Sequence, residues 1–264
     1  METLRDKFWL WGHSPESHKV LWKGANLSRM TPAEGAYYLG VKKIFMVCFH
    51  NHPIPPFDED SMAMDSMDEV VWSITGDAGC DIEEGTLGHL EEILRIADIY
   101  PNITGAIFDD FFDFRNGERE RIFTPDVLRG VRKKLAGKNL SMWLAAYDRD
   151  FDNPRMDYLN EFDSFILGIW RHEFRAKQEE TIKRIRKITA GKPLVPCIYL
   201  GNNWQGTPVT ASDIKNQLDL YARLLREGVT DGILFCSNLA AGMVGLETVA
   251  CVKQWIKIHG DEQV

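Results

Sequence analysis

At 264 residues the chain has the length of one (β/α)8 barrel, and its 44% hydrophobic and 27% charged residues are typical of a globular protein with a large core. Asp and Glu outnumber Lys and Arg by 39 to 31. The resulting net charge of −8 disfavours nucleic acid and anionic membranes as partners, because both attract basic surfaces. An uncharged substrate is compatible with this balance.

The amino-terminal residues Met1–Lys7 lack a basic start followed by an apolar stretch, so we expect no signal peptide. No run approaches the roughly 18 apolar residues that a membrane span needs. The cysteines are odd in number, widely spaced and without a C-x-x-C pattern, which favours free buried thiols over disulfides or zinc ligands. They are Cys48, Cys80, Cys197, Cys236 and Cys251. A cytoplasmic location is therefore expected.

Short apolar runs, rich in branched and aromatic residues, recur along the chain and predict strands that are buried on both faces. In chain order they are residues 8–13, 43–50, 69–75, 103–109, 140–147, 164–170, 194–200 and 232–237. These eight runs alternate with helical patterns without an internal linker. The alternation predicts a closed parallel barrel, a single (β/α)8 domain over residues 1–264.

The helices between these runs are predicted from caps and periodicity. Thr31 and Glu34 form a capping box with Pro32 at the first helical position, so a helix should run toward Gly40. Thr124 and Pro125 open another helix, which should end near Gly137. Further helices are expected at residues 86–98, 174–190, 212–227 and 245–258, and only short ones between strands 2 and 3 and between strands 5 and 6.

A doubly wound open sheet is the alternative fold. Such a sheet usually carries a glycine-rich phosphate loop after its first strand. Here the first run is followed by Gly12-His-Ser-Pro-Glu-Ser-His18, which has no G-x-G-x-x-G pattern. The barrel is therefore favoured.

Barrel enzymes carry their chemistry at the carboxyl ends of the strands, so the polar and aromatic residues that follow the runs are the candidate site. They are His13, His50, Trp72, Asp109, Asp110, Asp113, Tyr147, Asp148, Trp170, Glu173, Tyr199, Asn202, Asn203, Trp204 and Asn238. Aromatic rings stack on sugars, and carboxylates and amides bind hydroxyl groups, so a small carbohydrate is the expected substrate. By contrast, Trp9, Trp11 and Trp143 are expected in the core.

Asp109 and Asp110 are the strongest candidates for catalysis. They end an apolar strand and are followed by Phe111 and Phe112. Repulsion between the two carboxylates, together with desolvation, should raise the pKa of one of them and leave one acid and one carboxylate at neutral pH. Glycoside cleavage needs this pair, because it requires a proton for the leaving oxygen and a negative charge beside the cationic transition state.

The segment Ile107-Phe-Asp-Asp110 resembles the catalytic strand of the O-GlcNAcase-type β-N-acetylglucosaminidases, whose fourth barrel strand ends in an apolar-Phe-Asp-Asp stretch. In that family the acetamido group of the sugar is the nucleophile. The resemblance implies that Asp109 orients and polarises this group and that Asp110 acts as general acid and then as base. It also implies site roles for Tyr147 and for the amides of residues 202–203. Outside this short segment the chain agrees with the family only in architecture.

Other interpretations of the carboxylates remain open. Asp109 or Asp110 could be a nucleophile, with Asp148, Asp150 or Glu173 as acid/base, as in retaining enzymes whose carboxyl groups lie about 5–5.5 Å apart. The paired aspartates could instead form a hydrogen-bonded rim that shapes a loop. Asp148 and Asp150 could be held in local salt bridges.

A metal site is the main rival. The H-x-H pattern of His50 and His52 follows the second strand, and together with His13 and Asp109 it could bind a divalent ion. The chain would then be a metal-dependent sugar isomerase or hydrolase. A third interpretation is a carbohydrate-binding barrel without catalysis. For the glycosidase interpretation, no metal and no cofactor are expected.

Overall fold

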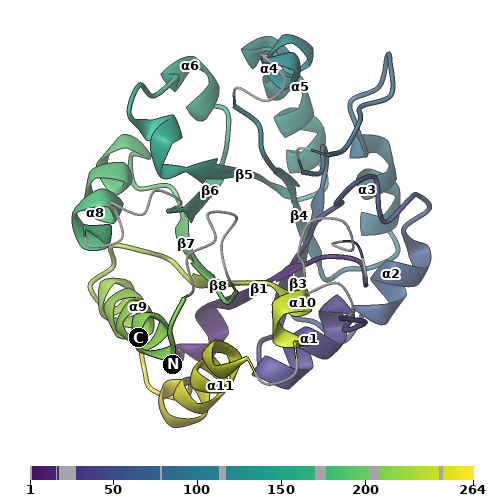
Figure 1. The fold of residues 1–264 in the computed structure, drawn as a ribbon. Coiled ribbons are helices and arrows are strands. Elements are labelled where there is room, and N and C mark those ends of the chain that lie inside the picture. The colour runs from purple at the N-terminus through teal and green to yellow at the C-terminus, as the bar shows by residue number, and fades with distance from the viewer. Residues whose placement is uncertain are drawn as a thin grey trace.

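Eight parallel strands form a closed barrel in the computed structural model of the protein (Figure 1). Each strand pairs with the next along the chain, and β8 closes the ring on β1. The strands are β1 (Phe8–Gly12), β2 (Lys43–Met46), β3 (Glu69–Ser73), β4 (Ile103–Phe108), β5 (Ser141–Tyr147), β6 (Ser164–Gly168), β7 (Leu194–Tyr199) and β8 (Ile233–Cys236). Each lies within one of the predicted runs, so the predicted (β/α)8 fold is confirmed.

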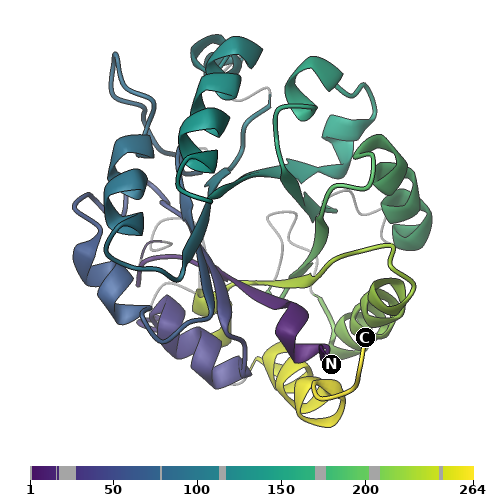
Figure 2. The ribbon, with the colours of Figure 1, turned by 180° about the vertical axis from the view of Figure 1, so that it is seen from behind.

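The structure describes residues 2–15, 17, 28–77, 79–112, 117–169, 177–201, 209–243 and 246–264. Within these ranges, helices form a ring outside the barrel (Figures 1 and 2). They are α1 (Pro32–Leu39), α2 (Asp58–Ala63), α3 (Leu90–Ala97), α4 (Glu118–Ile122), α5 (Pro125–Ala136), α6 (Met156–Leu159), α8 (Gln178–Ile188), α9 (Ala211–Arg226), α10 (Asn238–Ala241) and α11 (Glu247–His259), with the 3-10 turns η1 (Arg5–Lys7) and η2 (Asp148–Phe151). No described helix is long and apolar enough to cross a membrane.

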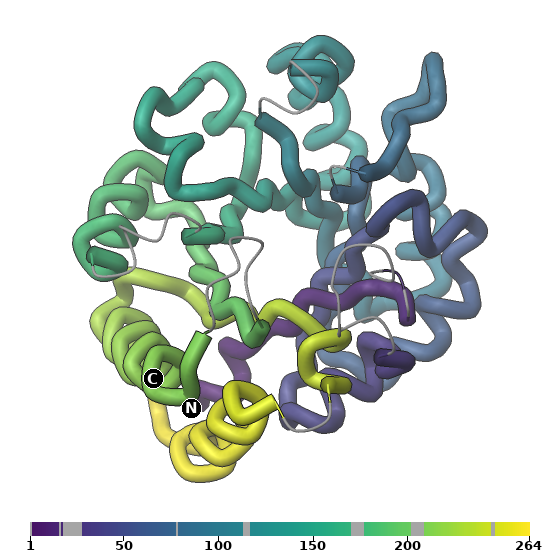
Figure 3. Tube along the Cα trace, in the orientation of Figure 1, coloured from purple at the N-terminus to yellow at the C-terminus, as the bar shows by residue number. Residues whose placement is uncertain are grey.

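The helix caps explain where several helices begin. The capping box of Thr31 and Glu34 opens α1, and the Thr124 hydroxyl accepts a hydrogen bond from the Val127 N–H at the start of α5. By contrast, α3 begins four residues later than predicted. Gly88 there has a φ of +59°, outside the helical region, and a Cβ at this position would lie 2.2 Å from the Ile74 carbonyl oxygen. The segment before α3 instead projects beyond the ring of helices (Figure 3).

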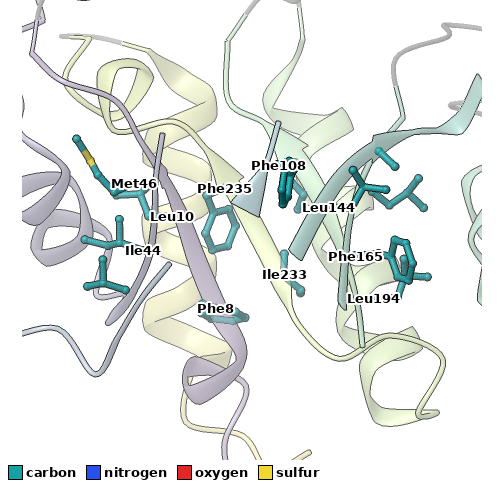
Figure 4. Packing of buried hydrophobic residues seen from close by; sticks show 14 of the residues in the cluster. Phe8, Leu10, Ile44, Met46, Phe108, Leu144, Phe165, Leu194, Ile233 and Phe235 are labelled. Carbon is teal, nitrogen blue, oxygen red and sulfur yellow. The ribbon is translucent and has the colours of Figure 1, made fainter. Parts of the chain in front are cut away.

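The core has two layers, because alternate residues of each strand face opposite sides. Outward-facing residues such as Leu10, Ile44, Phe108 and Phe165 pack between the barrel and the helices (Figure 4). Inward-facing residues fill the barrel and form the interior cluster. Its buried members are Trp9, Trp11, Phe45, Val47, Val71, Ile107, Trp143, Ala145, Ile166, Val195, Cys197 and Leu234. The prediction that three tryptophans of this cluster belong to the core is confirmed.

All five cysteines are free thiols, as predicted. Burial is only partly as expected, since Cys236 and Cys251 are half-buried while the other three are buried. The chain ends lie side by side in Figure 2, where Thr3 and Gln263 form an antiparallel bridge. The main-chain pairing of these ends lies outside the barrel and leaves its strand order unchanged.

Candidate active site

Asp109 and Asp110 lie directly after β4, at the end of the barrel where all eight strands finish, which we call the mouth. Asp109 continues the inward-facing alternation of Ile107 and is only 5% exposed. Asp110 would face outward in an extended strand, but its φ of +44° breaks the alternation. Its carboxylate instead accepts a hydrogen bond of 2.7 Å from the hydroxyl of Tyr147, at the end of β5. The structure thus brings both carboxylates to the mouth.

The electrostatics of the pair differ between its members. Burial raises the pKa of Asp109 well above its ordinary value, and the negative charges of Asp110 and Asp77 raise it further, while Arg119 opposes them. The N–H of Asp110 donates to Asp109 Oδ1 at 3.0 Å. Asp109 is therefore the carboxyl that tends to hold a proton.

Tyr147 stays a hydrogen-bond donor in this environment. Burial and the nearby charges of Asp110 and Asp109 raise the pKa of its hydroxyl well above the ordinary value. A second tyrosine, Tyr199 of β7, lies close by across Gly168 of β6. A Cβ on Gly168 would lie 2.6 Å from Tyr199 Oη and 2.8 Å from Tyr147 Cδ1, so the missing side chain makes room for both rings.

His13 lies in the mouth at the end of β1 and is 5% exposed. The indole N–H of Trp11 donates to His13 Nε2 at 3.0 Å, so in a neutral ring the proton resides on Nδ1. The ring also packs edge-to-face against Phe49, with centroids 5.3 Å apart. Trp11 thereby orients the imidazole.

The expected substrate contact of Asn238 is wrong. Its side chain is fully buried and extends the ladder between β1 and β8: Oδ1 accepts from the His13 N–H at 2.8 Å, and Nδ2 donates to the His13 carbonyl at 2.9 Å. Nδ2 also donates to the Met30 carbonyl at 2.7 Å. The amide is occupied by backbone groups, so its role is structural.

The prediction that Trp72 contacts the substrate is also wrong. It is fully buried on the outward face of β3, where its ring stacks on Phe57 with centroids 4.3 Å apart and an interplanar angle of 7°. Both faces of a barrel strand are apolar, so composition did not reveal which face the tryptophan occupies.

The acidic residues after β5, Asp148 and Asp150, lie in the 3-10 turn η2. Asp148 is fully buried at the start of η2, which argues against a direct contact with substrate. Asp150 accepts a hydrogen bond of 2.7 Å from the Tyr147 N–H and lies 3.7 Å from Arg149 Nε. The local salt bridge considered for Asp150 is therefore present, and its carboxylate helps to hold Tyr147 in place.

His50 and His52 are exposed at the rim. The N–H of His50 donates to Asp77 Oδ1 at 3.0 Å, and its ring lies against Gly79, where a Cβ would come within 2.5 Å of His50 Nδ1. Among the residues that the structure describes, no group of three or more His, Cys, Asp or Glu side chains is arranged to hold a metal ion. The structure does not bring His50 and His52 together with His13 and Asp109.

The remaining candidates lie outside the described residues. They are Asp113, Trp170, Glu173, Asn202, Asn203 and Trp204. His172 also falls there. Their proposed contacts stay predictions from the sequence.

Comparison with known proteins supports the fold. No family model and no curated protein matches the sequence. Among solved structures, a GH18 chitinase from Pseudoalteromonas aurantia matches 95% of this chain and 99% of its own, with a TM-score of 0.56 and 14% identity. A xylanase-α-amylase inhibitor protein in complex with trehalose matches 96% and 98%, with a TM-score of 0.59 and 10% identity. Tryptophan synthase from Pyrococcus furiosus matches 97% and 98%, with a TM-score of 0.53 and 10% identity. At such identities the likeness shows a shared barrel fold and nothing about activity.

Sequence reasoning missed two residues of the site. Gly168 carried a usable signal, because a glycine inside an apolar strand often marks close approach of another group. Arg119 carried none, since it belongs to a short charged segment, Gly117-Glu-Arg-Glu-Arg121, that is typical of a solvated surface. In the structure its side chain is 1% exposed and lies behind the carboxylate pair.

Proposed function

We propose that the chain is a glycoside-hydrolase-like enzyme that cleaves a sugar or glycoconjugate by carboxylate acid/base catalysis at Asp109 and Asp110. The observation that carries the proposal is the pair itself: a buried carboxyl with a raised pKa beside a half-buried carboxylate bound by Tyr147, both at the mouth. Two neighbouring carboxyls with different protonation supply the proton and the negative charge that glycoside cleavage requires.

The accessibility of the two carboxyls supports a division of roles. Asp110 is half-buried and so is the better placed to reach a glycosidic oxygen as general acid and then as base. For this step the proton that Asp109 tends to hold has to pass to Asp110, the more accessible carboxyl of the pair. Asp109, behind it, would orient the acetamido group if the substrate is an N-acetylhexosaminide, as the resemblance of the β4 segment implies.

Hydrolysis of a panel of aryl glycosides, including aryl β-N-acetylglucosaminides, tests this proposal. The variants are Asp110→Asn and, as a matched control, Asp65→Asn at an exposed turn after α2. We expect the wild type to release the aryl group, Asp110→Asn to lower kcat/KM by about 10²–10⁴-fold, and Asp65→Asn to have no effect.

Two other outcomes would each favour an alternative function. If the wild type and Asp110→Asn are equally inert while sugars still bind by calorimetry, the chain is a carbohydrate-binding barrel without catalysis. The fold permits this alternative, because one similar structure is that of an inhibitor protein in complex with trehalose. If turnover appears only when a divalent ion is added, the metal-dependent alternative replaces our proposal.

A further inference from the structure

Arg119 extends from the short helix α4 to the end of β4 beneath the carboxylate pair. Its guanidinium donates through Nη1 to the carbonyl oxygen of Asp109 and, at 3.1 Å, to that of Asp110. These carbonyls flank the left-handed residue that turns the second carboxylate into the mouth. The contacts are made to the backbone of the pair, so Arg119 acts on where the carboxylates point.

The same guanidinium also binds the end of β3. Nη1 donates to the Gly76 carbonyl at 3.0 Å, and Nη2 donates to the carbonyls of Thr75, at 3.3 Å, and Asp77. One buried side chain therefore joins the segments after two neighbouring strands. A planar guanidinium suits this task because its donors diverge at fixed angles, whereas a lysine has a single nitrogen.

Arg119 also places a positive charge behind the carboxylates. Burial lowers the pKa of the guanidinium, but arginine starts so far above neutral pH that it stays charged. Its charge opposes the rise in the pKa of Asp109 that burial, Asp110 and Asp77 cause. Arg119 therefore affects the proposed reactive pair in two ways, through hydrogen bonds to its backbone carbonyls and through its positive charge.

We propose that Arg119 is the positioning residue of the carboxylate pair: it holds the turn that aims Asp110 into the mouth and supplies the positive charge behind both carboxylates. As a positioning role, this inference rests on the proposed function, since it takes the pair as the reactive centre. Arg119 acts through the backbone carbonyls of the pair, whereas Tyr147 binds the side chain of Asp110.

The test compares Arg119→Gln, Arg119→Lys and a control, Arg155→Met. Arg155 is a suitable control because its guanidinium pairs at 2.8 Å with Glu120, on the same helix α4 as Arg119, and lies over the Tyr158 ring instead of the carboxylate pair. The readout is NMR of protein labelled with ¹³C at the aspartate carboxyls and with ¹⁵N in the backbone, titrated with pH and assigned with Asp109→Asn. This measurement needs no substrate.

We expect Arg119→Gln to move the titration midpoint of Asp109 to higher pH, because removing a positive charge disfavours the carboxylate. Arg119→Lys keeps the positive charge, so the titration midpoint of Asp109 should move less in this variant. Both should shift the backbone signals of Asp110, since neither replacement can bind all of the carbonyls. Arg155→Met should leave the midpoint and the backbone signals unchanged.

An unchanged Asp109 midpoint in a folded Arg119→Gln variant overturns the proposal, and so does an equal shift in Arg155→Met. If Arg119→Gln does not fold, Arg119→Lys decides: Asp110 signals like those of the wild type contradict the positioning role. Once a substrate is known, both Arg119 variants should lower kcat about tenfold or more with KM little changed. If no glycoside is cleaved by the wild type, the proposed function fails, while the titration still tests Arg119.

Discussion

Asp109 lies at the end of an apolar strand with 5% of its surface exposed, and the carboxylates of Asp77 and Asp110 add to the cost of ionising it. A buried carboxyl lowers this cost by holding a proton, and the native protein therefore binds that proton more tightly than the unfolded chain does. At the residue scale, the raised pKa of Asp109 should also be visible as a dependence of stability on pH.

Asp109→Asn should remove this dependence. In the wild type, the contribution of the protonated carboxyl is complete below the ordinary pKa of aspartate, near 3.9, and is lost as the pH rises through the raised native pKa. The amide is neutral at every pH. Urea denaturation between about pH 4 and pH 8 should therefore give similar stabilities at the acidic end and a more stable variant at the alkaline end.

Asp65→Asn provides the control for this comparison, because that side chain is exposed and should change stability equally little at both ends of the range. A constant difference between the wild type and Asp109→Asn across the pH range would mean that Asp109 titrates normally in the folded protein.

At the scale of elements, side chains continue the hydrogen bonds between neighbouring strands past the strand ends and so shape the mouth. β1 and β8 stop pairing after Trp11 and Cys236, yet Asn238 continues the pattern by binding both backbone groups of His13. His13 is in this way fixed on both sides, by the amide of Asn238 through its backbone and by Trp11 through its ring. The position of His13 in the mouth is thus set by the neighbouring side chains of Trp11 and Asn238.

Asn238→Asp is a test at this scale. The new carboxylate has nearly the same shape but cannot donate to the His13 and Met30 carbonyls, and the site is fully buried. Leaving buried polar groups unsatisfied should cost about 2–4 kcal/mol of unfolding free energy at neutral pH. Urea denaturation measures this loss, and Asn160→Asp, at an exposed position, should stay within about 0.5 kcal/mol of the wild type. Equal effects of the two changes would contradict the structural role of Asn238.

The elements that could be predicted from the sequence are those whose signals are local. The capping box at Thr31 and the cap at Thr124 were found because cap residues occupy fixed positions relative to the helix start. Asp109 and Asp110 were found because two adjacent carboxylates follow an apolar run, at the strand end where barrel enzymes carry their chemistry. Trp72 was misplaced, since a strand that is apolar on both faces does not show which face points into the barrel.

Arg119 could not be predicted, because the reason for its burial lies in carbonyl groups that other strands bring to it. The expected helix at residues 86–98 was too long for a similar reason. The left-handed Gly88 fits closely against the Ile74 carbonyl, a contact with the end of another element. Tertiary contacts therefore set both the extent of α3 and the geometry behind the carboxylates.

At the scale of the whole molecule, the interior of the barrel is filled, so chemistry is confined to the mouth. Trp9, Phe45 and Trp143 meet inside the barrel, with ring centroids 4.5 Å apart between Trp9 and Phe45 and 5.1 Å apart between Phe45 and Trp143. These rings come from β1, β2 and β5, so they connect strands on different sides of the ring (Figure 1). A filled interior is the usual arrangement of this fold, in which stacked side chains replace a pore.

Trp143→Ala should therefore weaken the whole barrel. The side chain is 8% exposed, its indole N–H donates to Ser141 Oγ at 2.7 Å, and its removal leaves a cavity beside the rings of Trp9 and Phe45. Removal of a large buried aromatic side chain costs about 3–5 kcal/mol. Because the lost contacts join β5 to β1 and β2, all strands should unfold together in urea, with a lower midpoint and an unchanged slope by circular dichroism.

The control is Ile258→Ala on α11, where the side chain is 59% exposed and the change should stay within about 0.5 kcal/mol. A separate early transition in Trp143→Ala would show that the β5 side of the barrel unfolds independently of β1 and β2. A loss below about 1 kcal/mol would show that the neighbouring rings close the cavity, since the cost of such a substitution depends on how completely the site collapses. Either result would mean that the interior rings do not hold opposite sides of the barrel together.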